Sequence, residues 1–421
     1  MGNPRKRTIR NALAAALTAV LGLLLSLVGT PPGDAEAAAT GLRVSNGRLY
    51  EANGSEFVMR GVNHAHLWYP SQTGSIANIA AKGANTVRVV LGSGDRWSKT
   101  SSSEVASLIS QCKASKVICV LEVHDTTGYG EDSSATTLDK AASYWVGLKS
   151  VLSGQENYVI VNIGNEPYGN NNYSGWTSAT KSAIGKLRGA GINNALMVDA
   201  PNWGQDWSNT MRDNASSVFA SDPDRNTIFS IHMYGVYDTA SEVQSYLSAF
   251  RNNGLPIVVG EFGNQHSDGD PNEDAIMSYA QSMGIGYLGW SWSGNGGGVE
   301  YLDMVNSFNP SSMTSWGQRL FYGSNGISST SRLATIYGGS GGGTAPNGYP
   351  YCSSSSADPD GDGWGWENSR SCVVRGGAAD GTGTAPNGYP YCSSSSADPD
   401  GDGWGWENSR SCVVRGGAAD R

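Results

Sequence analysis

The sequence predicts an α/β fold in which an eight-stranded (β/α)8 barrel precedes two small β modules, each stapled by one disulfide. Three observations support this prediction. Eight short apolar runs alternate with amphipathic stretches between residues 40 and 338, a segment near the C-terminus recurs with a period of 40 residues, and each copy of it carries two cysteines. Buried parallel strands that alternate with helices over roughly 300 residues are typical of a closed barrel.

The predicted barrel strands are near-continuous runs of apolar and β-branched residues: Val58–Asn63, Thr86–Val90, Val117–His124, Val159–Glu166, Ala195–Ala200, Thr227–Tyr234, Ile257–Phe262 and Gly286–Trp292. Helical patterns lie between most of them, at Ser103–Lys116, Leu138–Gly154, Trp176–Arg188, Thr210–Ala220, Ala240–Asn253 and Asn272–Met283. The fifth unit is the weakest, because its helix over 210–220 is short. An open doubly wound sheet is the alternative, and eight units at this length favour closure.

The N-terminus has the pattern of an export signal. Basic residues precede an apolar run from Leu13 to Val28, and small residues follow up to Ala39. This run of about 16 residues is shorter than the ~20 that span a bilayer, which favours a cleaved signal peptide over residues 1–39 rather than a membrane anchor. No later stretch is apolar enough to cross a membrane. The sequence therefore predicts a secreted, extracellular protein.

The charge balance argues against nucleic acid and anionic membranes as partners. The leader holds four basic and two acidic residues, so its removal takes the net charge from −9 to −11, whereas both of those partners require a positive surface. The chain has 13 Trp and 19 Tyr but only 7 Phe. Aromatic rings with a polar edge can stack on sugars while their rims stay hydrated. A neutral polysaccharide therefore suits this composition, and we expect a monomer.

Polar side chains end six of the eight predicted strands, where the reacting groups of such a barrel stand. They are Arg88, His124, Asn165, Glu166, His232, Tyr234, Glu261 and Trp290. Polar groups at the ends of apolar strands cost desolvation free energy unless they are paired. Core packing does not explain their clustering at one end of the barrel.

Two of these residues are carboxylates on strands that lie across the barrel from each other. Cleavage of a glycosidic bond with retention needs an acid that protonates the leaving oxygen and a carboxylate that attacks the anomeric carbon, about 5 to 5.5 Å apart. We predict Glu166 as the acid/base and Glu261 as the nucleophile. Arg88 and Tyr234 would keep Glu261 ionised, while burial and the charge of Glu261 would raise the pKa of Glu166. The alternative is that each glutamate is half of a buried ion pair.

The segments NTVRVV, LEVHD, NIGNEP, SIHMY, GEFG and GWSW resemble the signature set of glycoside hydrolase family 5 over essentially the whole of Gly41 to Tyr337. Within that family, RGVNHAHLWYP, LEVHDTTGYGE, NIGNEPYGN, VDAPNWGQDW, FSIHMYGVY and WSWSGNGGGVEYLD resemble secreted actinobacterial endo-β-1,4-mannanases. The resemblance implies the same two roles for Glu166 and Glu261, and it implies hydrolysis of internal bonds in mannan, glucomannan or galactomannan. An endo-β-1,4-glucanase on the same barrel and a non-catalytic carbohydrate-binding protein are the alternatives.

The resemblance also implies that the other polar residues at the strand ends flank the cleaved bond as substrate-binding residues: Arg88, His124, Asn165, His232, Tyr234 and Trp290. Asn165 can hydrogen-bond the sugar 2-hydroxyl. We expect Trp290 to form the platform under the reacting ring and Trp68, after the first strand, to form a second. Other residues either contact the ligand or support the rim: Trp203, Trp207, His64 and His66.

An acidic run follows the seventh strand and contains Asp268, Asp270, Glu273 and Asp274. Oxygen ligands in a loop suit Ca²⁺ as a structural ion. The equal alternative is a negatively charged helix N-terminus, which the helix dipole favours. No metal or cofactor is required for catalysis by two carboxylates.

The C-terminal region is a tandem repeat, in which 344–380 recur unchanged at 384–420. The expected order is a Gly-rich linker at 339–343, a module at 344–375, a second linker at 376–383, a module at 384–415 and a tail at 416–421. Each module is too small for a self-sufficient core, and in an exported chain we predict the bridges Cys352–Cys372 and Cys392–Cys412. Cys112 and Cys119 either pair with each other or remain buried thiols.

Each module carries two tryptophans spaced i, i+2, which places both rings on one face of a strand: Trp364 and Trp366, or Trp404 and Trp406. With neighbouring tyrosines they would form a flat strip for a sugar chain. The stretch GWGWENSRSCV resembles carbohydrate-binding module family 10, whose members generally bind crystalline cellulose, although this chain has one cysteine pair per module where that family usually has two. The run from Asp358 to Gly363 begins like a calcium loop, but it lacks the glutamate at the twelfth position, and a polar turn is the preferred interpretation.

Overall fold

The computed structural model describes residues 41–338 and, in the C-terminal region, residues 345, 349, 351–352, 358, 361–367, 370–374, 379, 389, 391–392, 397–407, 410–414 and 417–420. The predicted signal peptide lies outside the described residues, as do the linker at 339–343 and most of the linker at 376–383. Among the helices of the described part, none is long and apolar enough to span a bilayer.

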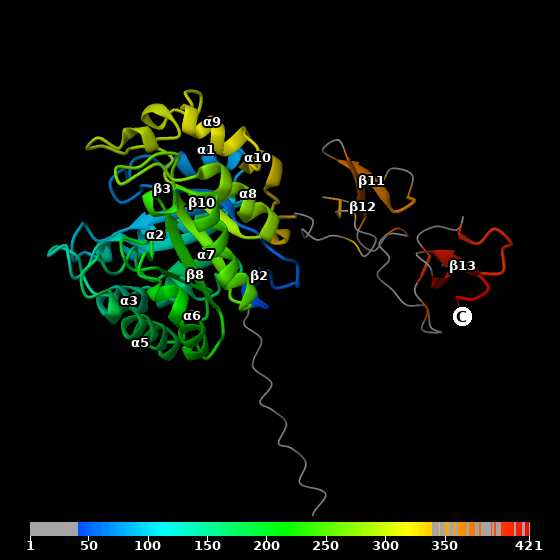
Figure 1. Ribbon diagram of the computed structural model, residues 1–421, viewed down its shortest axis with the longest axis horizontal. Helices are drawn as coiled ribbons and strands as arrows, with labels where there is room; N and C mark the ends of the chain where they lie inside the picture. Colours follow the sequence, from blue (N-terminus) through cyan, green and yellow to red (C-terminus); the bar gives the residue numbers. More distant parts are fainter. Residues whose placement is uncertain are drawn as a thin grey trace, which may run out of the picture. The chain divides into compact units, whose positions relative to one another are not determined.

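Residues 41–338 contain a closed barrel of parallel strands, hydrogen-bonded in the order β10-β3-β4-β5-β6-β7-β8-β9 (Figure 1). Their bounds are β3 Arg60–His64, β4 Thr86–Leu91, β5 Ile118–Val123, β6 Val159–Asn162, β7 Leu196–Asp199, β8 Thr227–Met233, β9 Ile257–Phe262 and β10 Gly286–Gly289. Every residue of these strands is buried, since side chains fill the interior and helices cover the outside. The predicted fold class is confirmed.

The helices surround the strands (Figure 1): α1 Ser75–Ala81, α2 Ser102–Ala114, α3 Leu138–Gly147, α4 Lys149–Leu152, α5 Trp176–Gly189, α6 Thr210–Ser221, α7 Ala240–Asn252, α8 Glu273–Met283, α9 Ser315–Tyr322 and α10 Ile327–Thr330. The long helix predicted over 138–154 is two helices that break at Leu148, directly after Gly147, a residue with a poor helix propensity. Two predicted strands also stop early, at Asn162 and Gly289, because the following residues form loops over the barrel mouth.

An antiparallel hairpin precedes the barrel and consists of β1 Arg43–Ser45 and β2 Arg48–Tyr50. Leu49 and Phe57 of this segment belong to one apolar cluster with Ile160 of β6 and Met197 of β7. This cluster fills the barrel interior with apolar side chains. The charged side chains of the interior therefore gather at the other end, where the strands finish.

The pairing of β8 with β9 changes register at one point. Ile231 lies opposite Val259, but His232 lies opposite Glu261, so Gly260 is an extra residue. A Cβ at Gly260 would lie only 2.1 Å from the Ser230 hydroxyl oxygen, which explains the glycine. Bulges of this kind re-aim side chains near active sites. Here the bulge brings Glu261 level with His232.

The two predicted module disulfides, Cys352–Cys372 and Cys392–Cys412, are confirmed. Cys112 at the end of α2 and Cys119 in β5 are both fully buried, and their sulfur atoms face each other at 2.6 Å. This separation is longer than the ~2.05 Å of a disulfide and shorter than the contact between two thiols, so the pairing of these cysteines stays a prediction.

Arg188 near the end of α5 and Asp222, which precedes β8, form a buried ion pair. Arg188 donates from Nε to Oδ1 of Asp222 at 2.8 Å and from Nη2 to Oδ2 at 3.0 Å, and the Asp222 side chain is fully buried. Asp222 also accepts hydrogen bonds from the Asn226 backbone and the Thr227 hydroxyl. Removal of one partner of a buried pair leaves an uncompensated charge.

We expect Asp222→Ala to lower the free energy of unfolding by about 3–5 kcal/mol, measured by denaturant titration. The matched control is Asp213→Ala, whose pair with Arg212 is exposed and should be worth no more than about 1 kcal/mol. Although burial acts in the opposite direction, the bonds from Arg188 lower the pKa of Asp222. The stabilisation of the fold by Asp222 is therefore fully present above the ordinary carboxyl pKa, and it is lost as the pH falls through the lowered pKa of Asp222. Equal losses in the two variants would contradict this assignment.

Candidate active site

The charged side chains of the barrel gather at the C-terminal ends of its strands. Arg88 is in β4, His232 is in β8 and Glu261 is in β9, while Asn165 and Glu166 follow β6. In a parallel barrel, the inward-pointing side chains near the C-terminal ends of the strands meet one another above the apolar interior. The structure therefore brings together residues that are up to 173 positions apart in the sequence.

Glu166 and Glu261 face each other across this mouth. One oxygen of each carboxylate and a ring nitrogen of His232 all lie within 4.8 Å of one another. His232 bridges the pair, since its Nδ1 is 2.8 Å from Glu166 Oε1 and 3.5 Å from Glu261 Oε2. The spacing suits a carboxylate pair that reacts with retention, and inverting pairs stand about 6.5 Å apart or more.

The backbone at Glu166 is strained. Its φ is +39°, a left-handed conformation that a residue with a Cβ rarely adopts. Gly128 and Tyr168 donate backbone hydrogen bonds to the Glu166 carbonyl at 3.0 and 2.8 Å and hold this turn in place. Strain of this kind concentrates where a side chain must be aimed for function. Here it turns the Glu166 side chain out of the strand direction and toward Glu261.

Arg88 is the centre of the site and is completely buried. Its guanidinium donates to Glu261 at 2.7 Å and to Asp199 at 3.0 Å. It also donates to three asparagine side chains, each at 2.7 to 2.8 Å: Asn63, Asn162 and Asn165. All five N–H groups of an arginine are thereby used, and the fork fixes Glu261 in one orientation.

The pKa of Glu261 lies above its ordinary value, which the sequence analysis did not anticipate. Burial is the main cause, and the negative charge of Glu166 acts in the same direction, whereas His232 and Arg88 lower the pKa. Tyr234 donates its hydroxyl to Glu261 Oε2 at 3.0 Å. Arg88 and His232 therefore favour the ionised form of Glu261 against the effect of burial.

Aromatic rings line the mouth beside these carboxylates. The ring of Trp290 stacks at 24° to that of His124, with centroids 5.8 Å apart, and the Trp290 indole donates to Asn295 at 2.8 Å. Trp68 stands edge-on to His124 at 5.1 Å and is 39% exposed. Trp97, which the sequence analysis missed, lies edge-on to Trp68 at 5.5 Å. These rings form an aromatic wall around His124.

Several residues left open by the sequence analysis have structural partners. The Trp203 indole donates to Glu131 at 3.0 Å, while Trp207 donates to Asn170 at 2.7 Å and stays half exposed. The two histidines after the first strand support the fold: His66 pairs with Glu104 at 2.9 Å, and burial lowers the pKa of His64 to about 3. The side-chain oxygen of Asn165 accepts from Arg88, and its amide donates to Thr127 at 2.8 Å.

Four further interior residues were missed: Asn63, Glu122, Asn162 and Asp199. Each is fully buried at the polar end of a barrel strand. The sequence held a signal for them, because a polar or charged side chain interrupts an otherwise apolar strand in GVNH, VLEV, IVNI and MVDA. A buried polar group in such a strand requires a partner.

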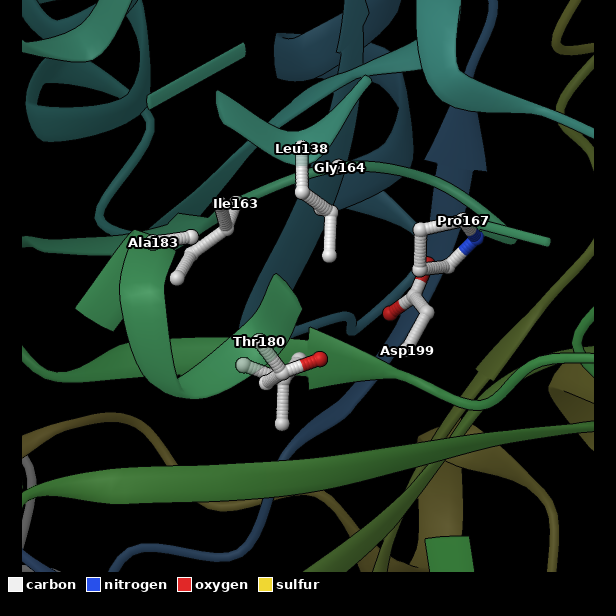
Figure 2. A pocket seen from close by; sticks show the side chains of 8 residues that line it. Leu138, Ile163, Gly164, Pro167, Thr180, Ala183 and Asp199 are labelled. Carbon is white, nitrogen blue, oxygen red and sulfur yellow. The ribbon is translucent and has the colours of Figure 1, made fainter. Parts of the chain in front are cut away.

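A small pocket lies behind the Glu166 loop and is too small to admit water. In Figure 2 the apolar side chains of Leu138, Ile163 and Ala183 lie on one side of it, with Pro167 and Asp199 on the other. It is a packing gap and not a substrate site. Asp199, one of its lining residues, has no exposed surface.

The acidic run after β9 has partners within the protein. Asp268 accepts from Gln205 at 2.8 Å and from the Gly235 backbone at 3.1 Å, and Asp274 accepts from Arg319 at 2.8 Å. Glu273 and Asp274 occupy the first turn of α8. In the described part of the chain these carboxylates do not converge on a common centre. Two of the four carboxylates therefore stand at a helix N-terminus, and calcium binding by this run stays a prediction.

The described parts of the two modules are alike. Each contains one antiparallel hairpin: β11 Trp364–Glu367 with β12 Arg370–Val373, and β13 Trp404–Glu407 with β14 Arg410–Val413. Trp366 is 68% exposed, while Trp364 is partly buried and stands at 87° to the ring of Tyr349. The rings of Trp364 and Tyr349 therefore do not lie in one flat strip, and the strip that contains Tyr351 stays a prediction. The Asp358 carboxylate accepts three backbone N–H groups, from Gly361 to Gly363, as the carboxylate of a polar turn does. In the second copy one oxygen each of Asp398, Asp400 and Asp402 lie within 4.8 Å of one another, so the choice between a polar turn and a calcium loop stays a prediction.

Known proteins resemble the barrel and the modules separately. A family model described as cellulase (glycosyl hydrolase family 5) matches residues 50–296. A second model, described as a cellulose or protein binding domain, matches residues 342–374 and 382–414.

Relatives match most of the chain. The mannan endo-1,4-β-mannosidase of Streptomyces lividans is 74% identical over 88% of this chain and all of its own length. That of Cellvibrio japonicus is 52% identical over 86% of this chain and 84% of its own length. The solved mannotriose complex of Thermomonospora fusca β-mannanase is 60% identical, with a TM-score of 0.70 over 71% of this chain and all of its own. With its barrel, its facing glutamates and these relatives, the chain belongs to glycoside hydrolase family 5.

Proposed function

We propose that the chain is a retaining endo-β-1,4-mannanase that cleaves internal bonds of mannan, glucomannan or galactomannan by double displacement. The observation that carries the mechanism is the approach of the Glu166 and Glu261 oxygens to within 4.8 Å. Glu261 attacks the anomeric carbon, and Glu166 protonates the leaving glycosidic oxygen. In the second step Glu166 takes a proton from water, which attacks the glycosyl-enzyme bond and releases Glu261.

The groups around the nucleophile have complementary roles in this mechanism. Arg88 and Tyr234 hold the two oxygens of Glu261 by separate hydrogen bonds, which leaves the carboxylate aimed in one direction. Such preorganisation avoids reorganisation during attack. His232 donates to Glu166 on the side that faces Glu261, and so it sets the orientation of the acid.

We propose that the aromatic wall forms the sugar platforms. Trp290 presents its ring beside the carboxylates and would lie under the reacting sugar, while Trp68 would hold the next one. His124 stands between the two rings and can donate to a sugar hydroxyl. The amide of Asn165 has a second N–H besides the one given to Thr127, and this N–H is the candidate donor to the 2-hydroxyl.

The preference for mannan over glucan rests on the relatives, because a glucanase would use the same two glutamates. The test is reducing-sugar release from galactomannan, glucomannan and carboxymethylcellulose in parallel. We expect release from the first two and little from the third. Faster release from carboxymethylcellulose would establish the glucanase alternative, and no release from any of them would leave a binding protein.

We propose that the two modules hold the enzyme on cellulose or another insoluble polysaccharide. Trp366 and Trp406 are each 68% exposed on identical hairpins, and two tethered weak sites increase retention at a surface. Deletion of 343–421 should reduce adsorption to crystalline cellulose and leave kcat on soluble mannan within about twofold, since the barrel carries the reacting groups. The double substitution Trp366→Ala and Trp406→Ala should reproduce the loss. Unchanged adsorption in both variants would remove the binding role.

We further propose that the chain is exported as a monomer and that its catalysis needs no metal. The export proposal rests on the basic and apolar leader at 1–39. Two carboxylates supply both the proton transfer and the nucleophile. We therefore expect activity to survive exhaustive treatment with EDTA, and a loss of activity that Ca²⁺ restores would show a required structural ion.

A further inference from the structure

Two buried carboxylates beside the active site have no role in the mechanism above. Glu122 in β5 and Asp199 in β7 have no exposed surface. Each lies next to a histidine: Glu122 Oε1 is 2.9 Å from His124 Nδ1, and Asp199 Oδ2 is 3.4 Å from His232 Nε2. Both also flank Arg88, at 3.9 and 3.0 Å. The site therefore holds four carboxyl groups, and three of them, those of Glu122, Asp199 and Glu261, lie beside Arg88.

Neither carboxylate is in contact with solvent. The second oxygen of Glu122 has no hydrogen-bond partner in the described part of the protein. Asp199 lines the small pocket of Figure 2 together with Leu138 and Ile163. An ionised carboxylate in such a place is stable only beside positive charge. Arg88 supplies one positive charge, which is too little for four carboxyls.

The two histidines are the remaining bases that face the cluster. His232 is surrounded by Glu166 at 2.8 Å, Asp199 at 3.4 Å and Glu261 at 3.5 Å, which come from three different strands or strand ends. His124 meets Glu122 directly, with Glu261 and Glu166 farther away. Its other neighbours are the rings of Trp68, Trp97 and Trp290. Carboxylates are thus the nearest charged groups to both imidazoles.

We propose that Glu122 and Asp199 are positioning residues that hold His124 and His232 as imidazolium ions. With Arg88 and two imidazolium ions, the four carboxyl groups are electrically balanced when one of them carries a proton. The identity of that carboxyl, Glu166, rests on the proposed function. The protonation state of the histidines rests on the geometry alone.

The electrostatics of the cluster agree with this arrangement. Burial lowers the pKa of both histidines, but the facing carboxylates outweigh it; they raise the pKa of His124 and bring that of His232 to about 10. Arg88 and His232 lower the pKa of Asp199 to about 2 despite its burial. The imidazolium form of each histidine is therefore present below its raised pKa and is lost as the pH rises through that pKa.

The proton on each histidine has a consequence for the reaction. A doubly protonated His232 can donate from Nδ1 to Glu166, while its Nε2–H lies 3.4 Å from Asp199, at ion-pair distance without a hydrogen bond. A doubly protonated His124 gives Nδ1–H to Glu122 and keeps Nε2–H as a donor to substrate. In neutral imidazoles one nitrogen would be an acceptor, and one of these donors would be absent.

The experiment is histidine NMR on the full chain labelled with ¹⁵N-histidine, which has only five imidazoles to resolve. His124→Asn and His232→Asn each remove one signal and assign it. In the wild-type protein at pH 7 we expect both nitrogens of His124 and of His232 to carry protons. Glu122→Gln should lower the titration midpoint of His124 by about one to three pH units, and Asp199→Asn should do the same for His232.

Glu104→Gln is the matched control, because Glu104 pairs with His66 at 2.9 Å outside the site. It should leave the signals of His124 and His232 unchanged. Neutral imidazoles in the wild-type protein at pH 6 would overturn the proposal, as would unchanged midpoints in folded Glu122→Gln and Asp199→Asn proteins. Failure of the proposed function would look different, with no sugar released although both histidines carry two protons.

Discussion

Replacement of Glu261 by alanine is expected to lower kcat on soluble mannan by roughly 10⁴- to 10⁶-fold, the range found when an essential group of a catalytic unit is removed. The variant lacks the atom that attacks the anomeric carbon, and Arg88 and Tyr234 then face an empty position. Steady-state release of reducing sugar measures the loss. Circular dichroism and the thermal midpoint Tm of the variant show whether it is folded.

Azide provides a sharper test of the same assignment. In Glu261→Ala the space beside the anomeric carbon admits this small anion, which attacks an activated aryl β-mannoside from the side that Glu261 occupied. The expected product is the α-glycosyl azide. The control is Glu261→Gln, which keeps the side-chain volume and should show little rescue. Full activity of Glu261→Ala, or a β-configured azide product from it, would contradict the nucleophile assignment.

Replacement of Glu166 by alanine should slow the cleavage of substrates with poor leaving groups much more than the cleavage of substrates with good leaving groups. Loss of a general acid costs typically 10²- to 10⁴-fold, and we expect a loss in this range on mannan, whose leaving alcohol needs a proton. A dinitrophenyl β-mannoside leaves without one, so its first step should remain fast while the glycosyl-enzyme accumulates. Rapid-quench measurement of the dinitrophenol burst distinguishes the two steps.

Two further measurements on Glu166→Ala, the pH profile and the product formed with azide, test the role of Glu166 as acid/base. The alkaline limb of kcat/KM reports the protonated acid and should disappear in Glu166→Ala for the activated substrate. Azide now replaces the water of the second step and should yield the β-glycosyl azide, the opposite configuration to that from Glu261→Ala. Equal losses on mannan and on the dinitrophenyl substrate would show that Glu166 acts on another step or on folding.

The barrel could be predicted from the sequence because its signals are local. A run such as Thr86–Leu91 or Ile257–Phe262 is apolar throughout, and the helix patterns between such runs reveal the parallel order. The position of Glu261 in its strand followed from the same pattern. The ends of the strands were less predictable: Glu166 was placed at the end of a strand, but β6 ends at Asn162 and Glu166 stands in a strained turn.

The supporting charges were not predicted, although their residues are visible in the sequence. Glu122 and Asp199 were passed over as parts of apolar strands. Their importance lies in distances to Arg88 and to the two histidines, which are set by the closure of the barrel and by the bulge at Gly260. The edge-to-face angle between Trp364 and Tyr349 was not predictable for a similar reason, since the angle between two rings depends on packing.

The sequence by itself determined the fold class, the two module bridges and the pair of glutamates, because apolar periodicity, cysteine spacing and polar strand ends are all short-range patterns. Only the tertiary structure decided which charges surround that pair. Closure of the barrel buries four carboxyl groups, one arginine and two histidines together, and there the protonation of each group depends on neighbours that lie far away along the chain.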